Sequence, residues 1–209
     1  MAAVAARAPQ RPDRELEPET AELAGTRSSD VRFVDAALRA ADFSDARLPH
    51  LELRNCALRA CNLANLQARG ANLERVTIEG SRLTGVRFVE ARLTDVTISG
   101  CRVDLASFGG TRMERVTFED CQLAQTDLLE ATLDGVRFDD CDLRAVDFRG
   151  ARLRNTEFRR CEISELLGVE SLRGAAFEWE TIVGMAEVWA TALGIKVLPE
   201  TSQREPSAL

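Results

Sequence analysis

The chain has 209 residues, a net charge of -7 and a pI near 5.0. Aromatic residues are scarce and tyrosine is absent, so large rings neither fill the core nor form a stacking platform for nucleic-acid bases. The acidic balance argues against direct binding of nucleic acid, because phosphate contacts need a basic surface, and no apolar run approaches the roughly 18 residues of a membrane helix.

Residues 1–30 are rich in Ala, Pro, Arg and Glu and show no period of apolar side chains. Such a composition buries too little apolar surface to offset the entropy lost on ordering. We therefore predict a mostly disordered tail, with a short helix around Leu16 and Leu23 as the alternative. Arg7 interrupts the apolar run that starts at Ala2, so no secretory signal peptide is predicted.

Residues 31–165 carry an apolar side chain at every fifth position without a break. One series runs from Phe33 to Ile163 and holds 27 apolar residues, 26 of them large. A second series runs from Val31 to Cys161, two residues before each member of the first, and consists of compact or aliphatic uncharged residues. A period of five fits neither the 3.6 of a helix nor the 2.0 of a strand. The chain must therefore turn a corner every five residues.

A second period of 20 residues is superimposed on the first. Cys101, Cys121 and Cys141 recur at this spacing, and so do Phe118 and Phe138. Four sides of five residues then make one coil, so residues 20 apart should stack. The 135 residues give about 6.75 coils, and at ~4.8 Å per coil the stack would be roughly 32 Å long.

The repeats read as short triplets such as Ala71-Asn72-Leu73 and Cys141-Asp142-Leu143. These triplets resemble the A(D/N)LXX motif of the pentapeptide-repeat family, and the resemblance covers about two thirds of the chain. It implies an all-β solenoid, a right-handed quadrilateral parallel β-helix with a short C-terminal capping helix. The central Leu or Phe and the residue two before it would point inward.

Candidates for chemistry are few. All six cysteines fall in the inward series, where Cys acts as a small apolar residue, and no CxxC pair occurs, so neither a metal site nor a native disulfide is predicted. Free buried thiols fit a reducing cytoplasm. His50 is the only histidine, Lys196 is the only lysine, and no phosphate-binding glycine motif is present. We predict no catalytic residue and no cofactor, and therefore no enzyme.

Charge is segregated along the repeats. Residues 149–163 form a basic collar with five Arg against two acids. Residues 114–147 carry only three Arg and form an acidic band that could bind a basic protein partner. The alternative is a set of self-complementary ion pairs that keeps the rod soluble. The ten carboxylates of the acidic band are Glu114, Glu119, Asp120, Asp127, Glu130, Asp134, Asp139, Asp140, Asp142 and Asp147.

The last segment, residues 166–198, should cap the final coil, because an exposed stack edge invites end-to-end pairing. The five-residue register fails after Ile163, although Leu167, Leu172 and Phe177 suggest a shifted continuation. A helical period predicts one helix over about 180–193, with Gly194 as its C-cap. A short strand could follow at 195–198, and we expect a disordered tail at 199–209.

The uninterrupted repeats and the capping helix are most similar to the MfpA-type quinolone-resistance branch of the family. In that branch the rod imitates duplex DNA and binds DNA gyrase and topoisomerase IV, and the C-terminal helix joins two rods. The resemblance implies a partner site on the acidic band and a homodimer contact through Met185, Val188 and Trp189.

A DNA mimic should be acidic along most of its length, whereas residues 31–165 hold 20 Arg and 22 Asp or Glu. The alternative is a cytoplasmic scaffold that binds another protein.

Overall fold

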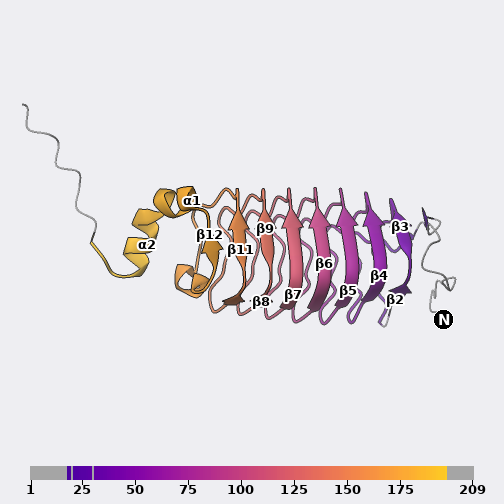
Figure 1. Ribbon diagram of the computed structural model, residues 1–209. Helices are drawn as coiled ribbons and strands as arrows, with labels where there is room; N and C mark the ends of the chain where they lie inside the picture. The colour runs from indigo at the N-terminus through magenta and orange to yellow at the C-terminus, as the bar shows by residue number, and fades with distance from the viewer. Residues whose placement is uncertain (1–17, 20, 30, 197–209) are drawn as a thin grey trace, which may run out of the picture.

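The computed structural model describes residues 18–19, 21–29 and 31–196 of the chain, which form one straight rod of stacked coils (Figure 1). It is a right-handed, four-sided parallel β-solenoid of about seven turns, as the period of five predicts. Strands of successive coils pair in parallel with residues 20 apart as partners, so that Leu53 lies opposite Leu73 and Leu73 opposite Leu93. The strands are β1 (Pro18–Glu19), β2 (Arg32–Val34), β3 (Ala37–Arg39), β4 (Glu52–Arg59), β5 (Asn72–Glu79), β6 (Arg92–Ser99), β7 (Arg112–Glu119), β8 (Thr132–Asp134), β9 (Arg137–Asp139), β10 (Arg152–Arg154), β11 (Glu157–Arg159) and β12 (Ala176–Phe177).

The corners explain why the chain turns every five residues. Every fifth residue from Asp35 to Glu165 has a positive φ, between 47 and 70°. This left-handed conformation turns the chain from one side of the coil to the next, and it favours Gly, Asn and Asp. Leu105, at φ 59°, is the one large apolar residue at a described corner.

The corners divide each coil into four sides. β4 to β7 each run over the first and second sides, whereas single parallel bridges hold the third and fourth sides together. We name each side by the inward residues at its centre: the first side from Phe33 to Leu153, the second from Leu38 to Phe158, the third from Phe43 to Ile163 and the fourth from Leu48 to Phe148.

The two predicted inward series form the core. Every centre from Phe33 to Phe158 is buried, and only the last centre, Ile163, is partly exposed. Aromatic rings stack along the second side, with centroids 5.2 Å apart for Phe118 and Phe138 and 5.0 Å for Phe138 and Phe158. The 20-residue period of the sequence therefore equals the number of residues in one coil.

The solenoid begins before Val31, so the prediction of a tail over residues 1–30 is wrong for the described residues of that segment. β1 pairs with β3, and Glu22 and Arg27 bridge to the coil that follows. Ala21 and Leu23 pack against the core at the spacing of the two inward series, and Gly25 turns the corner at φ 64°. Leu16, the other part of the predicted helix, lies outside the described residues.

At the C-terminal end the register changes by one residue. Gly168 occupies the place 20 residues after Phe148, and the 3-10 helix η1 (Val169–Leu172) follows it. The chain then returns to the stack in β12, where Phe177 lies opposite Phe158 at a spacing of 19. The rings of these two residues are stacked at 4.5 Å, which agrees with the shifted continuation expected from the sequence.

Two helices cover the end of the rod (Figure 1). They are α1 (Trp179–Gly184) and α2 (Ala186–Ala192), in place of the one helix predicted over 180–193. The break lies at Met185, whose buried side chain draws the chain onto the last coil. Gly194 ends α2 at φ 72°, as predicted. Ile195 and Lys196 form no strand, and the expected strand end at 197–198 and the tail at 199–209 lie outside the described residues.

Within the described residues, no helix has the length and apolar character to cross a membrane.

Candidate protein-interaction surface

The predicted acidic band does not form one face, because its ten carboxylates lie on all four sides of the rod. Each group of five residues lies on a different side of the rod from the next group. A band that is continuous in sequence is therefore divided by the corners. Their places follow from the residue numbers: Glu114 and Asp134 on the first side, Glu119, Asp120, Asp139 and Asp140 on the second side and its corner, Asp142 on the third, and Asp127, Glu130 and Asp147 on the fourth.

Four of the ten carboxylates form ion pairs with arginines, all from residues 144 onward. Arg144 pairs with Asp142 at 2.7 Å and Arg149 pairs with Asp147 at 2.6 Å. Arg160 contacts both Asp139 and Asp140, the latter at 2.9 Å. The acidic band and the basic collar therefore neutralise each other in part.

Two of these pairs lie within one coil. Hydrogen bonds from the Arg144 guanidinium hold the pKa of the Asp142 carboxyl below its usual range, and those from Arg149 do the same for Asp147. Each of these carboxylates also accepts the backbone N–H two residues on, at 3.1 and 3.0 Å. Both are ionised at neutral pH and already have partners, so they are poorly suited to capture another protein.

Other carboxylates of the band are bound by neutral donors. Asp127 accepts hydrogen bonds from the Ser107 hydroxyl at 2.9 Å and from the Leu129 N–H at 2.8 Å. Asp134 accepts one from the Asn155 amide at 3.1 Å. These contacts orient the two carboxylates without bringing a positive charge to them.

Four carboxylates do gather at one place, which we call the acidic corner: Glu119, Asp120, Asp139 and Asp140. They occupy equivalent positions in two successive coils, because Glu119 pairs in register with Asp139. Glu119 and Asp120 form no ion pair with any residue that the structure describes. The corner adjoins an open groove of about 620 Å³ lined by Asp120 and Asp140 together with residues of the third side.

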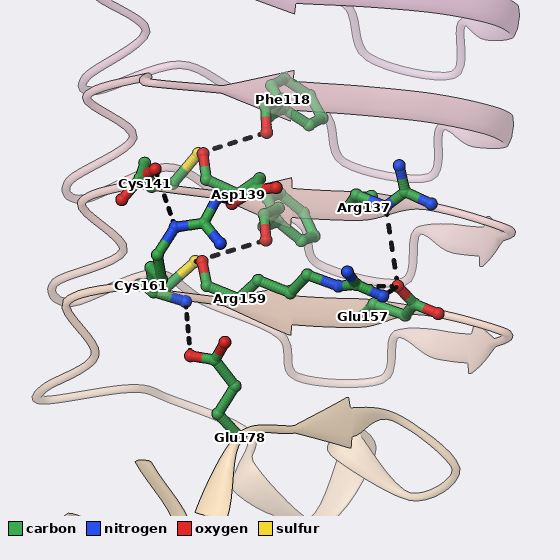
Figure 2. Close-up of polar contacts among 11 residues, drawn as sticks. Phe118, Arg137, Asp139, Cys141, Glu157, Arg159, Cys161 and Glu178 are labelled. Carbon is green, nitrogen blue, oxygen red and sulfur yellow. Dashed lines mark hydrogen bonds and ion pairs between the residues drawn. The ribbon is translucent and has the colours of Figure 1, made fainter. Parts of the chain in front are cut away.

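Arg160 was not assigned to this site from the sequence, although its position in the 20-residue period points to it. It lies 20 residues after Asp140 and therefore one coil further along the same corner. Its backbone N–H also donates to the Glu178 carboxylate at 2.8 Å, which ties the acidic corner to the start of α1. Figure 2 shows Glu178 beneath Cys161 and Asp139 beside Cys141.

The floor of the groove is a ladder of thiols, Cys101, Cys121 and Cys141, which continues to Cys161. Each thiol donates to a carbonyl of the preceding coil, as Figure 2 shows for Cys141 to Phe118 at 3.5 Å. Hydrogen bonding to the neighbouring thiol and burial raise the pKa of Cys121 and of Cys141 to about 12. Cys121 and Cys141 are therefore protonated, and all the cysteines of the ladder are free thiols. No group of metal-binding side chains occurs among the described residues.

Two of the three predicted dimer contacts lie in the cap's own packing. Met185 is buried, and Trp189 packs edge-to-face on Phe177 with ring centroids 5.6 Å apart. Val188 is 41% exposed and lines a shallow groove. The residues that the cap presents most to solvent are others, chiefly Trp179 at 72% exposure and Leu193 at 76%.

Comparison with known proteins bears on the fold. A search of curated proteins found no match. Among solved structures, a trypsin-treated form of QnrB1, a plasmid-mediated fluoroquinolone resistance protein, is 15% identical with a TM-score of 0.38, over 88% of this chain and 100% of that chain. HetL, a pentapeptide repeat protein involved in heterocyst differentiation regulation from the cyanobacterium Nostoc, is 16% identical with a TM-score of 0.28, over 73% and 89% of the two chains. A pentapeptide repeat protein from the Arabidopsis thaliana thylakoid lumen is 16% identical with a TM-score of 0.25, over 65% and 70%.

The sequence profile of the pentapeptide repeat region matches residues 55–124 and 91–166. Together these matches cover more than half of the chain and the same residues whose corners and inward series build the rod. The chain therefore belongs to the pentapeptide-repeat family.

Proposed function

We propose that the chain is a non-catalytic protein-interaction rod whose acidic corner binds a basic surface of a partner protein. The observation that carries this proposal is the pair of carboxylates on Glu119 and Asp120, which form no ion pair within the described part of the chain. Asp120 lines an open groove, and Glu119 precedes it at the end of β7. Two neighbouring carboxylates on a backbone fixed by paired strands favour Arg or Lys of a partner.

DNA gyrase is the partner that we propose to test first. This choice rests on the resemblance to the MfpA-type branch, and QnrB1 is itself named as a fluoroquinolone resistance protein. The acidic corner would take the place of duplex DNA. Elsewhere in residues 31–165 the numbers of acidic and basic side chains are nearly equal. A shorter track of charge should give weaker inhibition than a fully acidic rod would.

The experiment is a supercoiling assay with purified gyrase and increasing amounts of the rod. The wild-type chain is expected to inhibit supercoiling, and a variant with Glu119, Asp120, Asp139 and Asp140 all changed to Ser is expected to lose that effect. Stability should change only modestly, because Glu119, Asp120 and Asp140 are exposed and the pairs of Arg160 with Asp139 and Asp140 lie at the surface. No inhibition by the wild-type chain at micromolar concentration would end the gyrase proposal.

A matched variant tests whether the site or only the net charge matters. Asp45, Glu90, Glu130 and Glu165 are exposed corner residues in other columns. Changing these four to Ser removes the same charge and should leave inhibition intact. Equal loss in both variants would show that the effect is nonspecific electrostatics and not a contact at the acidic corner.

The second candidate is a scaffold for a partner other than gyrase, and the near-neutral charge of the repeats favours it. The acidic corner would then serve a different basic protein. Affinity capture with the wild-type chain and with the four-Ser acidic-corner variant separates the two cases. A stoichiometric non-topoisomerase protein that only the wild-type chain retains would support the scaffold.

We also propose that the cap joins two rods, through the apolar side chains it exposes. Trp179, Val183, Val188 and Leu193 remain at the surface of α1, α2 and the residue that follows, whereas Met185 packs inward. A Leu193→Glu change places a charge in this contact and should convert a cap dimer to monomer in sedimentation velocity. An unchanged sedimentation coefficient would exclude a contact at Leu193.

A further inference from the structure

The fourth side of the rod changes sign along its length. Arg27, Arg47 and Arg87 are exposed and form no ion pair with the residues that the structure describes. The acidic residues follow in the later coils of the same column. In stacking order, the column of outward residues is Arg27, Arg47, Gln67, Arg87, Ser107, Asp127, Asp147 and Leu167.

Between the basic and acidic halves lies a small apolar area. Leu105 is 56% exposed at one corner of the fourth side, and Leu129 is 40% exposed near the other. Gly109 and Gly110 lie between these two leucines and carry no side chains, so a second protein can approach the backbone closely there. Leu105 keeps a left-handed conformation that disfavours its side chain, and folding alone gives no reason for a leucine there.

From this arrangement we propose that two copies of the chain associate side by side and antiparallel through their fourth sides. A two-fold axis that lies in the interface and is perpendicular to the rods reverses the order of the coils. It places each column of residues opposite the same column of the second copy. The basic half of one copy then faces the acidic half of the other, twice by symmetry. Parallel rods would instead place arginine on arginine, so the charges of this column favour the antiparallel dimer.

The centre of the interface is fixed by the column itself. With the axis at Ser107, Arg87 faces Asp127 of the second copy, because both lie one coil from the axis. The same operation places the two Leu105 side chains against each other and Val89 against Leu129. An apolar centre flanked by two identical ion pairs results.

Two other columns of the fourth side bring like charges together in this register, because Arg69 faces Arg149 and Glu90 faces Glu130 of the second copy. Arg69 is paired with Glu90 and Arg149 with Asp147 in the same chain, so each of these positions is close to neutral. Glu130 therefore faces a Glu90 whose charge is offset by Arg69. Arg87 and Asp127 are the opposite charges, without an ion pair to any described residue of their own chain, that this register brings together.

The dimer should be weak and sensitive to salt. One side of a narrow rod offers less area than the ~800 Å² per partner of a standard stable interface. Exposed charge pairs are screened within ~8–10 Å at physiological ionic strength. Self-association is therefore expected at low salt and high protein concentration, and it should fall as salt is added.

Sedimentation velocity on the full chain at roughly 200 µM, in about 20 and about 500 mM NaCl, tests the proposal. The wild-type chain should associate further at low salt than at high salt, beyond any dimer that the cap forms. Arg87→Glu and Asp127→Arg should each weaken association at least about tenfold, because each places like charges opposite one another twice. A wild-type chain that stays monomeric at low salt would overturn the proposal.

Mixing the two variants supplies the decisive result. The Arg87→Glu chain has an acidic side chain at both deciding positions of its fourth side, and the Asp127→Arg chain has an arginine at both. Each variant therefore repels itself and attracts the other. An equimolar mixture should recover association to within about threefold of wild type. No recovery from two variants that both melt like wild type would contradict the antiparallel register.

Two controls keep the result specific. Asp127→Asn keeps the acceptor for the Leu129 N–H and should still weaken association, at least about threefold, so the test does not depend on the folding of Asp127→Arg. Leu193→Glu removes the cap contact and should leave the salt-dependent part of the association unchanged, and loss of that part would assign it to the cap. The acidic-corner variant should dimerise normally, so failure of the gyrase test leaves this proposal independent.

Discussion

At the scale of single residues, the rod depends on what each corner can accommodate. Ala40 and Ala60 show that a small side chain is tolerated at φ 52°. Gly80 has a similar φ of 54°, and a Cβ added there would meet nothing within 4 Å. Gly168 has φ 75°, and its Cβ would lie 2.3 Å from the backbone nitrogen of Arg149.

We therefore expect Gly80→Ala and Gly168→Ala to differ sharply although both residues have a positive φ. Gly80→Ala should cost about 1 kcal/mol or less of unfolding free energy, since only the conformation is strained. Gly168→Ala should cost more than about 2 kcal/mol, because backbone must move to relieve the clash. Denaturant unfolding measures both values, and similar losses would show that the close approach at Gly168 is unimportant.

The ion pair between Asp147 and Arg149 gives a prediction about pH. The folded state lowers the pKa of the Asp147 carboxyl, so its contribution is complete above the unfolded pKa of about 3.9 and is lost as pH falls through the folded value. Asp147→Asn should be less stable than wild type by about 0.5–1 kcal/mol at pH 7 and equal to it near pH 2. Melting temperatures across this range check the sign, and a constant difference at all pH values would contradict it.

At the scale of elements, the cap is the part whose stability rests on a few rings. Trp189 on α2 packs against Phe177 of β12, and Phe177 stacks on Phe158 of the last regular coil. The indole N–H of Trp189 has no hydrogen-bond partner within the described residues. Trp179, on α1, is largely exposed and supplies a matched control.

Replacing the two tryptophans should therefore have unequal effects. Trp189→Ala should cost about 3 kcal/mol through lost packing, whereas Trp179→Ala should change stability by less than about 0.5 kcal/mol. Trp189→Phe should cost less than the Ala variant, because it keeps a ring on Phe177 and removes a donor without a partner. Equal losses for Trp189→Ala and Trp179→Ala in thermal unfolding would exclude this account of the cap.

Sequence reasoning predicted the elements well where one rule governs every residue and less well at both ends. The period of five gave the inward side chains from Phe33 to Phe158 because the corner and the core position repeat together. Residues 21–27 obey the same spacing, but the inward Thr26 is polar, which hid the earlier coil. The cap could not be placed because Met185 breaks the helix to fill space that only the folded last coil defines.

The acidic band illustrates a different limit of the sequence. Its ten carboxylates are close along the chain, yet the corners distribute them over four sides. The contacts that decide which of them remain available, such as Arg160 with Asp139 and Asp140, join residues 20 or 21 apart. Rewriting the sequence in rows of 20 brings the acidic corner and its counter-ion together, and only the structure shows that Asp142 and Asp147 are taken by arginines two residues on.

At the scale of the whole molecule, the rod is a one-dimensional stack in which each coil contacts its neighbours. Removing residues 81–100 would join Gly80 to Cys101 and preserve every inward position, corner and column. Removing residues 81–98 would leave Ser99 and Gly100 as two extra residues between Gly80 and Cys101, so the chain must bulge at that corner before the next coil can stack.

We expect the 20-residue deletion to fold with the circular dichroism of a β-solenoid and a modest loss of stability. The 18-residue deletion should be clearly less stable than the 20-residue deletion, although it removes less of the chain. Cooperative unfolding of both shortened chains, with similar midpoints, would mean that the stacking register does not control folding of the rod.

The thiol ladder adds a built-in record of how this molecule comes apart. Cys161 is its most accessible rung and lies directly under the cap, while Cys141, Cys121 and Cys101 follow one coil deeper each. A reagent that modifies only uncovered thiols would meet them in that order if the rod unwinds from its C-terminal end, and all together if it unfolds in a single step. Because the cysteines lie one coil apart, the order in which they are modified gives the direction in which the coils unfold.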